Sequence, residues 1–562
     1  MKLRNCLDHT SIYYFGLVLM AIGLPLSHFL MSISQFVLVG NWIWEGNTRQ
    51  KFRRFRQNKS ALVLSSVFLL HILGLMFTTD FNYALNDIRI KLPLLILPII
   101  ISSSEPLDRK KFERLMLFFV GSVLLGSVVS ISELLGINNL IREFSGQPAR
   151  QILDIRNISL FISHIRFGLL ICIAIFTLVY FIVSEFTHTF RHAAQTPREY
   201  FVFQSYVLYS NSQNVLKIII YCSSLAWLLV FLFILESITG LGILLITTMI
   251  ILLYFAFTRQ RIKQKLIYLG VILAIPLIII TFLCRITDAL LTVNPVNIER
   301  LDQYTLKGNK YSHYLNNKDV ENGNHVWHYV CEKELAEEWN KRSDIKYDGK
   351  DQKDQLLKYT LIRFLTSKGF RKDADGVNKL AENEVRSIEQ GIANVNYQNA
   401  PGLIVRLQEI IWEFNHYMKG GEPGGHSVVQ RTQFWKAAIG IIEKNPLTGV
   451  GTGDVNTAFF MQYDKMSSPL DNKFRKRAHN QYLTMAVAFG IFGLCWFIFS
   501  LFYPLFAEKK VFDYFYMTFF IITLLSMLTE DTLETQAGVS FFAFFNCLLL
   551  FGRNERETVK NG

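Results

Sequence analysis

Three basic side chains that could bind an anion or move a proton stand beside long apolar stretches. Arg431 lies in RTQFW, His479 in RKRAHNQYL just before the run TMAVAFGIFGLCWFIFSLF, and Arg166 in SHIRFGLL at the start of another run. A guanidinium can bond two phosphate oxygens at once, and histidine can take a proton from a hydroxyl near neutral pH. Simpler roles stay open: a solvated or capping histidine at a helix start, and arginines that anchor the chain at a membrane surface.

Two further cations and an acidic cluster also lie at the ends of apolar runs. Arg89 and Lys91, in DIRIKLPLL, could add to a phosphate site. Glu530, Asp531 and Glu534 follow the apolar run that ends near residue 529. These acids could bind a cation, but we prefer to interpret them as part of a solvated loop.

Two motifs suggest chemistry that their spacing does not support. Gly449, Gly451 and Gly453, in NPLTGVGTGD, lack the GxGxxG spacing and a preceding strand, so a tight turn is favoured over a nucleotide site. His325 and His328, in HVWHYV, have metal-like i, i+3 spacing, but nothing nearby completes a ligand set. We expect these histidines at the surface and predict no metal site.

The composition indicates a membrane protein. Of 562 residues, 51% are hydrophobic and 18% are charged, and 47 are phenylalanine. The net charge of +13 comes largely from short loops between apolar runs, which argues against nucleic-acid binding. The seven cysteines include no CxxC pair, so a zinc or disulfide framework is not expected. A second apolar stretch follows the first at once, and no cleavable signal peptide is expected.

Apolar runs long enough to cross a membrane alternate with basic loops. A spanning helix needs roughly 20 apolar residues. Residues 12–45 predict a two-helix hairpin broken near Pro25, and further spans are predicted at 61–78, about 90–103, 115–135, about 158–183, 218–235, 239–257, 266–283, 480–503, 511–529 and 537–552. With about twelve spans, the clusters RQKFRRFRQNK, LDRKKFER and TRQRIKQK all face the cytoplasm. The predicted fold class is therefore an all-α polytopic helical bundle.

Residues 285–478 are polar and charged, and we expect them to form one large external insert. Apolar residues three and four apart predict helices in HVWHYVCEKELAEEWNKR, QLLKYTLIRFLTSKGF, LAENEVRSIEQGIANV and GLIVRLQEIIWEFNHYM. We therefore expect three parts: about nine spans within 1–284, a helical insert at 285–478 that carries Arg431, and about three spans within 479–562.

Part of this sequence resembles a known family. Arg431, Trp435, the NPLTGVGTGD turn and the AHNQYL start of a helix resemble the signature of the O-antigen ligase superfamily, most strongly over residues 424–502. Its members are integral-membrane glycosyltransferases that move a glycan off a polyprenyl-diphosphate carrier, such as undecaprenyl diphosphate. The resemblance implies a multi-pass protein of the bacterial inner membrane, with the insert in the periplasm, and no metal or other cofactor.

The resemblance also implies roles for individual residues. His479 stands in the context of the family's functional histidine and would orient or deprotonate the acceptor hydroxyl for an inverting displacement. Arg431 matches a periplasmic arginine of the family, and Arg166 resembles a second one, so both would hold the diphosphate. The implied acceptor is the lipid A–core or a similar hydroxyl compound, as in lipopolysaccharide biosynthesis.

Three alternatives stay open. An O-antigen or polysaccharide polymerase would transfer to another lipid-linked glycan, and a protein O-oligosaccharyltransferase would transfer to a Ser or Thr hydroxyl. A polysaccharide transporter or flippase could also have twelve spans. Such a transporter would be expected to show repeats and ionisable residues near the middle of the membrane, and the sequence shows neither.

The loop charges predict which parts of the chain face outward. A cysteine placed in the insert, as in Ser343→Cys, should react with an impermeant thiol reagent in intact spheroplasts, and Asn58→Cys in the basic loop should not. Labelling of Asn58→Cys alone would reverse the topology and place His479 in the cytoplasm.

Overall fold

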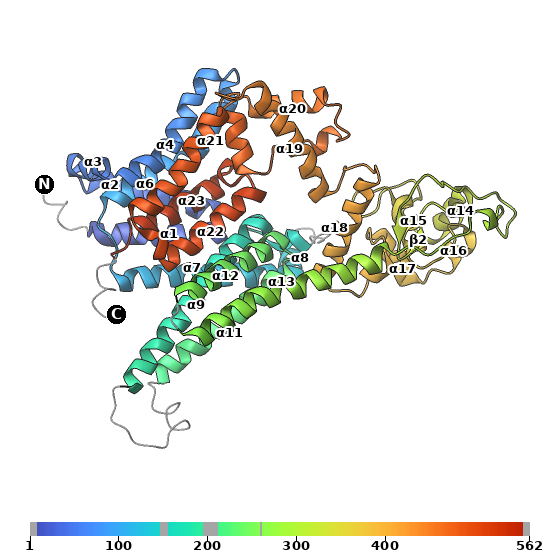
Figure 1. Ribbon diagram of the computed structural model, residues 1–562, viewed down its shortest axis with the longest axis horizontal. Coiled ribbons are helices and arrows are strands. Elements are labelled where there is room, and N and C mark those ends of the chain that lie inside the picture. Colours follow the sequence, from blue (N-terminus) through green and yellow to red (C-terminus); the bar gives the residue numbers. More distant parts are fainter. Residues whose placement is uncertain (1–7, 146–154, 195–211, 259–260, 555–562) are drawn as a thin grey trace. The chain divides into compact units, whose positions relative to one another are not determined.

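Helices dominate the computed structural model, which describes residues 8–145, 155–194, 212–258 and 261–554 (Figure 1). This confirms the predicted all-α class. Within the described residues the chain divides into two compact units. Unit 1 takes in Met1–Arg150, Ile155–Ile251 and Arg431–Gly562, and unit 2 takes in Leu252–Gln430.

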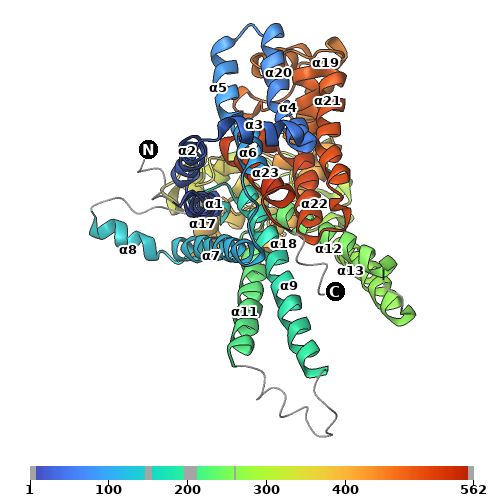
Figure 2. The ribbon, with the colours of Figure 1, turned by 90° about the vertical axis from the view of Figure 1, so that its left-hand side faces the viewer.

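Unit 1 consists of helices from both ends of the sequence. Its α-helices are α1 (His9–Leu26), α2 (His28–Trp44), α3 (Thr48–Gln57), α4 (Lys59–Leu73), α5 (Phe81–Lys91), α6 (Pro93–Ser103), α7 (Arg109–Leu134), α8 (Ile137–Phe144), α9 (His164–Ala194), α11 (Ser212–Ile234), most of α12 (Ile238–Thr258), most of α19 (Ser427–Lys444), α20 (Val455–Lys465), α21 (Gln481–Ala507), α22 (Tyr514–Thr529) and α23 (Gln536–Leu550). Its 3₁₀ turns are η2 (Gly74–Phe77), η3 (Ile155–Ile158), η6 (Asn472–Phe474), η7 (Lys510–Phe512) and η8 (Thr532–Glu534). Figure 2 shows α9 and α11 running side by side.

Unit 2 contains the last turns of α12, a long apolar helix and a small polar domain. Its elements are α13 (Ile262–Leu291), η4 (Ile298–Arg300), β1 (Val320–Glu321), β2 (Asn324–His325), α14 (Glu332–Arg342), α15 (Leu357–Ser367), α16 (Ala374–Asn378), α17 (Glu382–Glu389), η5 (Val395–Tyr397) and α18 (Gly402–Met418).

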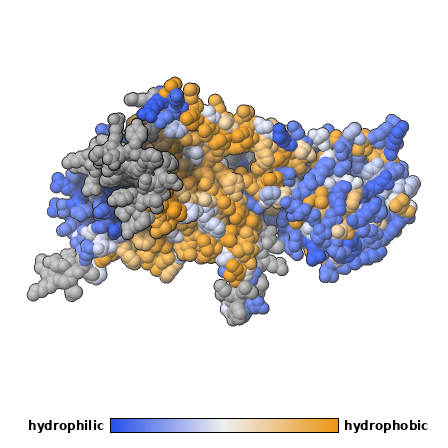
Figure 3. Space-filling model, turned by 90° about the horizontal axis from the view of Figure 1, so that it is seen from below, coloured by the Kyte–Doolittle hydropathy of each residue, from blue (hydrophilic) through white to orange (hydrophobic). Residues whose placement is uncertain are grey.

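Eight of the described helices are long and apolar enough to cross a membrane: α1, α4 with η2, α7, α9, α11, α12, α13 and α21. Their outward faces remain apolar, as Leu273, Leu277 and Ile278 on α13 illustrate with exposures of 72%, 65% and 66%. Figure 3 shows such hydrophobic surface as broad orange areas, whereas the polar domain is mostly blue. Apolar surface of this extent is expected where lipid is the solvent.

A helix lies at each of the twelve predicted span positions, but four of these helices are short. Helices α2, α6, α22 and α23 have 17, 11, 16 and 15 residues, and a straight crossing needs roughly 20. The number of crossings therefore stays a prediction. The first hairpin breaks at Ser27, two residues after Pro25, where the Ser27 hydroxyl caps α2 by accepting from the Leu30 amide at 3.2 Å.

A kink in α21 fixes the loop between α19 and α20. Gly490 has φ 64° and ψ −164°, a conformation almost confined to glycine. The kink frees carbonyls of α21, and the loop uses them: Val450 donates to the Val487 oxygen at 3.0 Å and Gly451 to the Ala488 oxygen at 2.9 Å. In return, the Ile491 amide donates to the Pro446 oxygen at 2.8 Å.

The same loop is tied to the end of α4. The Thr452 hydroxyl donates to the His71 carbonyl at 2.7 Å, and the Asp454 carboxylate accepts from the amides of Thr79 and Asp80, both at 2.8 Å. Gly451 has φ 86°, and a Cβ there would lie 2.7 Å from the Thr78 hydroxyl. The glycine-rich motif is thus a packed turn that joins α19 and α20 to α4 and α21.

The polar domain of unit 2 packs around its own core. Trp339, Leu361, Phe364 and Leu365 are fully buried in this cluster, and the Trp339 indole donates to the Ile345 carbonyl at 2.8 Å. The predicted helix from residue 325 begins only at Glu332.

A two-stranded hairpin precedes that helix. Asn322 and Gly323 both have positive φ, as a tight hairpin turn requires, so the Asn-Gly pair in ENGN was the available signal for this turn.

The positions chosen for thiol labelling need adjustment. Ser343 is only 8% exposed, and the Asn58 side chain caps α4 by accepting from the Ala61 amide. The exposed neighbours Asp344 and Gln57 carry the same topological test without either cost.

We predict that Gly490→Ala destabilises the protein by about 1–3 kcal/mol, because alanine does not tolerate this backbone conformation. A Cβ would also lie 2.2 Å from the Leu447 oxygen. Thermal unfolding of the purified protein in detergent measures the loss. The control is Gly121→Ala in α7, where no atom lies within 4 Å of the added carbon, so this change should be neutral or slightly stabilising. Equal melting temperatures for the two variants would contradict the strain at Gly490.

Candidate functional site

The backbone at the start of α21 holds His479 in place. His479 has φ 46°, and its amide donates to Oδ2 of Asp531 at 3.2 Å. Oδ1 of Asp531 accepts from the Asn480 amide at 3.0 Å and from the Thr484 hydroxyl at 2.7 Å. A carboxylate suits the positive end of a helix. Burial, with a contribution from Glu534, raises the pKa of the Asp531 carboxyl, and the hydrogen bond from Thr484 opposes this.

Helix α19 places an arginine and two aromatic rings beside His479. Arg431 and Trp435 are one helical turn apart and therefore share a face. The Trp435 indole donates to the carbonyl of Ala478 at 3.0 Å, directly before His479. The Phe434 ring lies 5.7 Å from the imidazole, centre to centre. The two motifs that were singled out in the sequence are thus in contact.

Glu530 joins the two predicted site residues. Its Oε1 accepts from Nη2 of Arg431 at 3.1 Å, and its Oε2 lies 3.7 Å from Nδ1 of His479. The side chains of Glu530, Arg431 and His479 are 16%, 25% and 38% exposed. The carboxylate is thus the least exposed of the three, and the imidazole is the most open to solvent.

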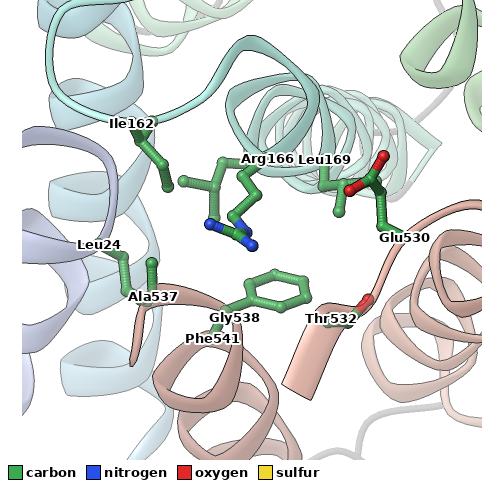
Figure 4. A pocket seen from close by; sticks show the side chains of 10 residues that line it. Leu24, Ile162, Arg166, Leu169, Glu530, Thr532, Ala537, Gly538 and Phe541 are labelled. Carbon is green, nitrogen blue, oxygen red and sulfur yellow. The ribbon is translucent and has the colours of Figure 1, made fainter. Parts of the chain in front are cut away.

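Arg166 lies at a cavity that Glu530 also lines. The cavity is partly open, and its volume of about 380 Å³ includes open solvent. Its walls are formed by Leu24, Ile162, Arg166, Leu169, Leu170, Glu530, Thr532, Ala537, Gly538 and Phe541. Figure 4 shows the guanidinium of Arg166 pointing into this space, with Glu530 and Thr532 on one side and Leu24 and Ala537 on the other. The cavity is therefore apolar over most of its wall and carries one cation and one carboxylate.

Lys91 lies in a separate, buried ion cluster. Its Nζ lies 2.5 Å from Oδ1 of Asp87 and 3.0 Å from Oε2 of Glu534, and Arg477 donates to the same Glu534 oxygen at 2.7 Å. Burial alone raises the pKa of Glu534, but Lys91 and Arg477 reverse this effect and hold the pKa below its usual range. Arg89, two residues before Lys91, is exposed.

The acidic cluster was the main error of the sequence interpretation. Glu530, Asp531 and Glu534 do not form a solvated loop: each is mostly buried, and each serves different partners. Their position directly after an apolar span was the available signal for burial, because ionisable groups next to a membrane span need partners.

The histidine pair in unit 2 was also misplaced by the sequence interpretation. His328 is 6% exposed rather than on the surface, and its ring stacks on His325 at 4.4 Å. Burial, with the nearby His325 and Lys372, lowers the pKa of His328 to about 4. Within the described residues, no group of three His, Cys, Asp or Glu side chains is arranged to hold a metal ion.

Comparison with known proteins gave one family. No curated protein matched the sequence. The model of the family described as O-antigen ligase matched residues 388–498, a stretch that contains Arg431, the glycine-rich turn and His479, whereas Arg166 and Glu530 lie outside it. The match confirms the resemblance found in the sequence motifs: residues 388–498 carry the pattern of the O-antigen ligase family.

Proposed function

We propose that this protein is a membrane glycosyltransferase of the O-antigen ligase type, which moves a glycan from a polyprenyl-diphosphate carrier to an acceptor hydroxyl. One observation carries the proposal. Arg431, Arg166 and His479, which are far apart in the sequence, gather around Glu530 at the edge of an apolar cavity. That arrangement suits a substrate with an apolar chain, an anionic centre and a hydroxyl reaction partner.

The cavity and the arginines suit the two ends of the donor. An isoprenoid chain would lie against Leu24, Leu169 and Phe541, where burial of apolar surface is favourable. The diphosphate would meet Arg431 and Arg166, whose planar guanidinium groups can each bond two oxygens. Fixed cations of this kind stabilise the charge that grows on a leaving diphosphate.

His479 would supply the proton chemistry. The acceptor oxygen attacks the anomeric carbon of the sugar as the bond from that carbon to the phosphate oxygen breaks, and the diphosphate leaves with the bonding pair. The acceptor proton passes to the imidazole, which must be neutral to receive it. Attack opposite to the leaving group inverts the anomeric centre. The open side of the 38% exposed imidazole would face the acceptor.

The other predicted cations have different places in this scheme. Lys91 is neutralised by Asp87 and Glu534, so we assign it a structural role rather than a share in the diphosphate site. Arg89 is exposed, and we assign it no contact with the diphosphate. The protein would lie in the bacterial inner membrane with the polar insert in the periplasm, and unit 2 would select the acceptor.

Gene deletion tests the reaction and identifies the acceptor. Loss of glycan from the lipid A–core, together with accumulation of the lipid-linked donor, is the expected result for a ligase. Unglycosylated protein would assign the Ser/Thr transferase reaction, and short glycan chains would assign the polymerase reaction. Unchanged glycoconjugates without donor accumulation would contradict all three.

We predict that Arg431→Lys lowers transfer by about tenfold or more at normal protein abundance. An ammonium cannot reproduce the two-pronged contact, and a hydrogen bond to a charged group contributes about 1.5–3 kcal/mol. The matched control is Arg475→Lys, because lysine also supplies the positive charge that pairs with the exposed carboxylate of Asp464, and transfer should change little. Equal and small losses in both variants would remove Arg431 from the site.

We predict that His479→Ala lowers transfer by about 10² to 10⁴, the usual contribution of a positioned acid or base. The abundance of the variant should be normal, because Asp531 binds the backbone amide of residue 479, and this contact does not need the imidazole. The acid-side fall of the wild-type pH profile should be absent from the residual activity of the variant. His9→Ala, which removes a contact with Asn41, is the control. Near wild-type turnover by purified His479→Ala in nanodiscs would end the catalytic assignment.

A further inference from the structure

We propose that Glu530 is a resident counterion, which occupies the diphosphate position while no donor is bound and is displaced when the donor enters. The inference rests on the proposed function and deepens it. Glu530 directs one carboxylate oxygen at Arg431 and the other at His479, and it lines the cavity into which Arg166 points (Figure 4). It thereby occupies the centre of the predicted site.

Two cations beside an apolar cavity call for such a group. Arg431 is three-quarters buried, and Arg166 points into a mostly apolar cavity. A cation in such surroundings needs a partner, because burying an unpaired charge is costly. Glu530 provides that partner for Arg431, and a diphosphate carries charge enough to replace it.

The two neighbouring acids, Asp531 and Glu534, contact other groups, so their contacts do not account for the position of the Glu530 side chain. Asp531 holds the start of α21 through two amides and a hydroxyl. Glu534 bonds Lys91 and Arg477. In the described part of the chain, the side chain of Glu530 contacts the two predicted site residues Arg431 and His479. Removing its charge should therefore alter ligand binding while the fold persists.

A counterion that must be displaced raises the intrinsic affinity that any ligand needs in order to occupy the site. Each ligand has to compensate for the lost contacts of Glu530, so a group with less charge or fewer oxygens gains little by entering. The displacement cost is common to both ligands, so it lowers both affinities by a similar factor and leaves the weaker one, a monophosphate, unbound at concentrations at which the diphosphate binds. This threshold separates the counterion role from simple support of the site, which would weaken binding of every ligand when it is removed.

The experiment measures binding of polyprenyl diphosphate and polyprenyl monophosphate to the purified full-length protein in nanodiscs. Glu530→Gln should bind the diphosphate about tenfold more tightly than wild type, the scale of one charge-assisted hydrogen bond that no longer has to be broken. Its affinity for the monophosphate should rise by a similar factor, because the displacement cost that is removed is the same for both ligands. Inorganic diphosphate, tested in parallel, isolates the charge contribution from that of the isoprenoid chain.

Two controls make the result specific. Asp464→Asn removes an exposed carboxylate that pairs with Arg475 and should leave both affinities unchanged. In an Arg431→Ala background, Glu530→Gln should raise the diphosphate affinity much less, because the guanidinium that Glu530 neutralises is already absent. Glu530→Ala repeats the test without the amide of glutamine.

Unchanged or weaker diphosphate binding by folded Glu530→Gln and Glu530→Ala, with normal wild-type binding that Arg431→Ala reduces, would overturn the counterion role and leave the donor site intact. Failure of both variants to give folded protein would assign Glu530 to stability and overturn the proposal equally. Absence of binding to the wild type and to all variants would instead overturn the donor site itself, and the inference with it.

Discussion

Charge buried beside apolar helices must be paired, and the structure of unit 1 around the site depends on this requirement. An unpaired ion in such surroundings costs far more than any single contact returns. Three carboxylates within five residues meet the demand in three directions: Asp531 at the start of α21, Glu534 between Lys91 and Arg477, and Glu530 toward Arg431 and His479. The short connection between α22 and α23 thus contacts the start of α21, Lys91 at the end of α5, and the candidate site.

A second constraint acts on α19 and α21. Gly490 interrupts the hydrogen bonds of α21, and the turn that follows α19 takes up the carbonyls left over. Helices α19 and α21, which carry Arg431 and His479, are therefore joined at two places. One is the turn near Gly490, and the other is the hydrogen bond from the Trp435 indole to the Ala478 carbonyl. Such double support is what a site needs if it is to hold reacting groups in register.

The sequence predicts the helices and the two motif residues well, because periodicity and residue type are local properties. It does not predict their partners. Glu530 lies 99 residues from Arg431, and Lys91 lies 443 residues from Glu534, so no pattern in either segment reveals the contact. Gly490 looks like one small residue in an apolar span, although its backbone shapes the site. The Asn-Gly pair of unit 2 is a local signal for a hairpin turn, but the helical periodicity of the following residues favoured a helix from residue 325.

The setting of the candidate site explains why a resident carboxylate would be useful. A membrane presents many phosphate-bearing lipid headgroups, and two arginines beside an apolar cavity would bind them without discrimination. Whether a ligand occupies a site depends on its absolute affinity, so a cost imposed on every phosphate ligand leaves the weakly bound ones unbound at their working concentration. A carboxylate that must be displaced imposes the same penalty on every anion. Only a ligand with more charge and more oxygens than a single phosphodiester then recovers the full contact with both guanidinium groups.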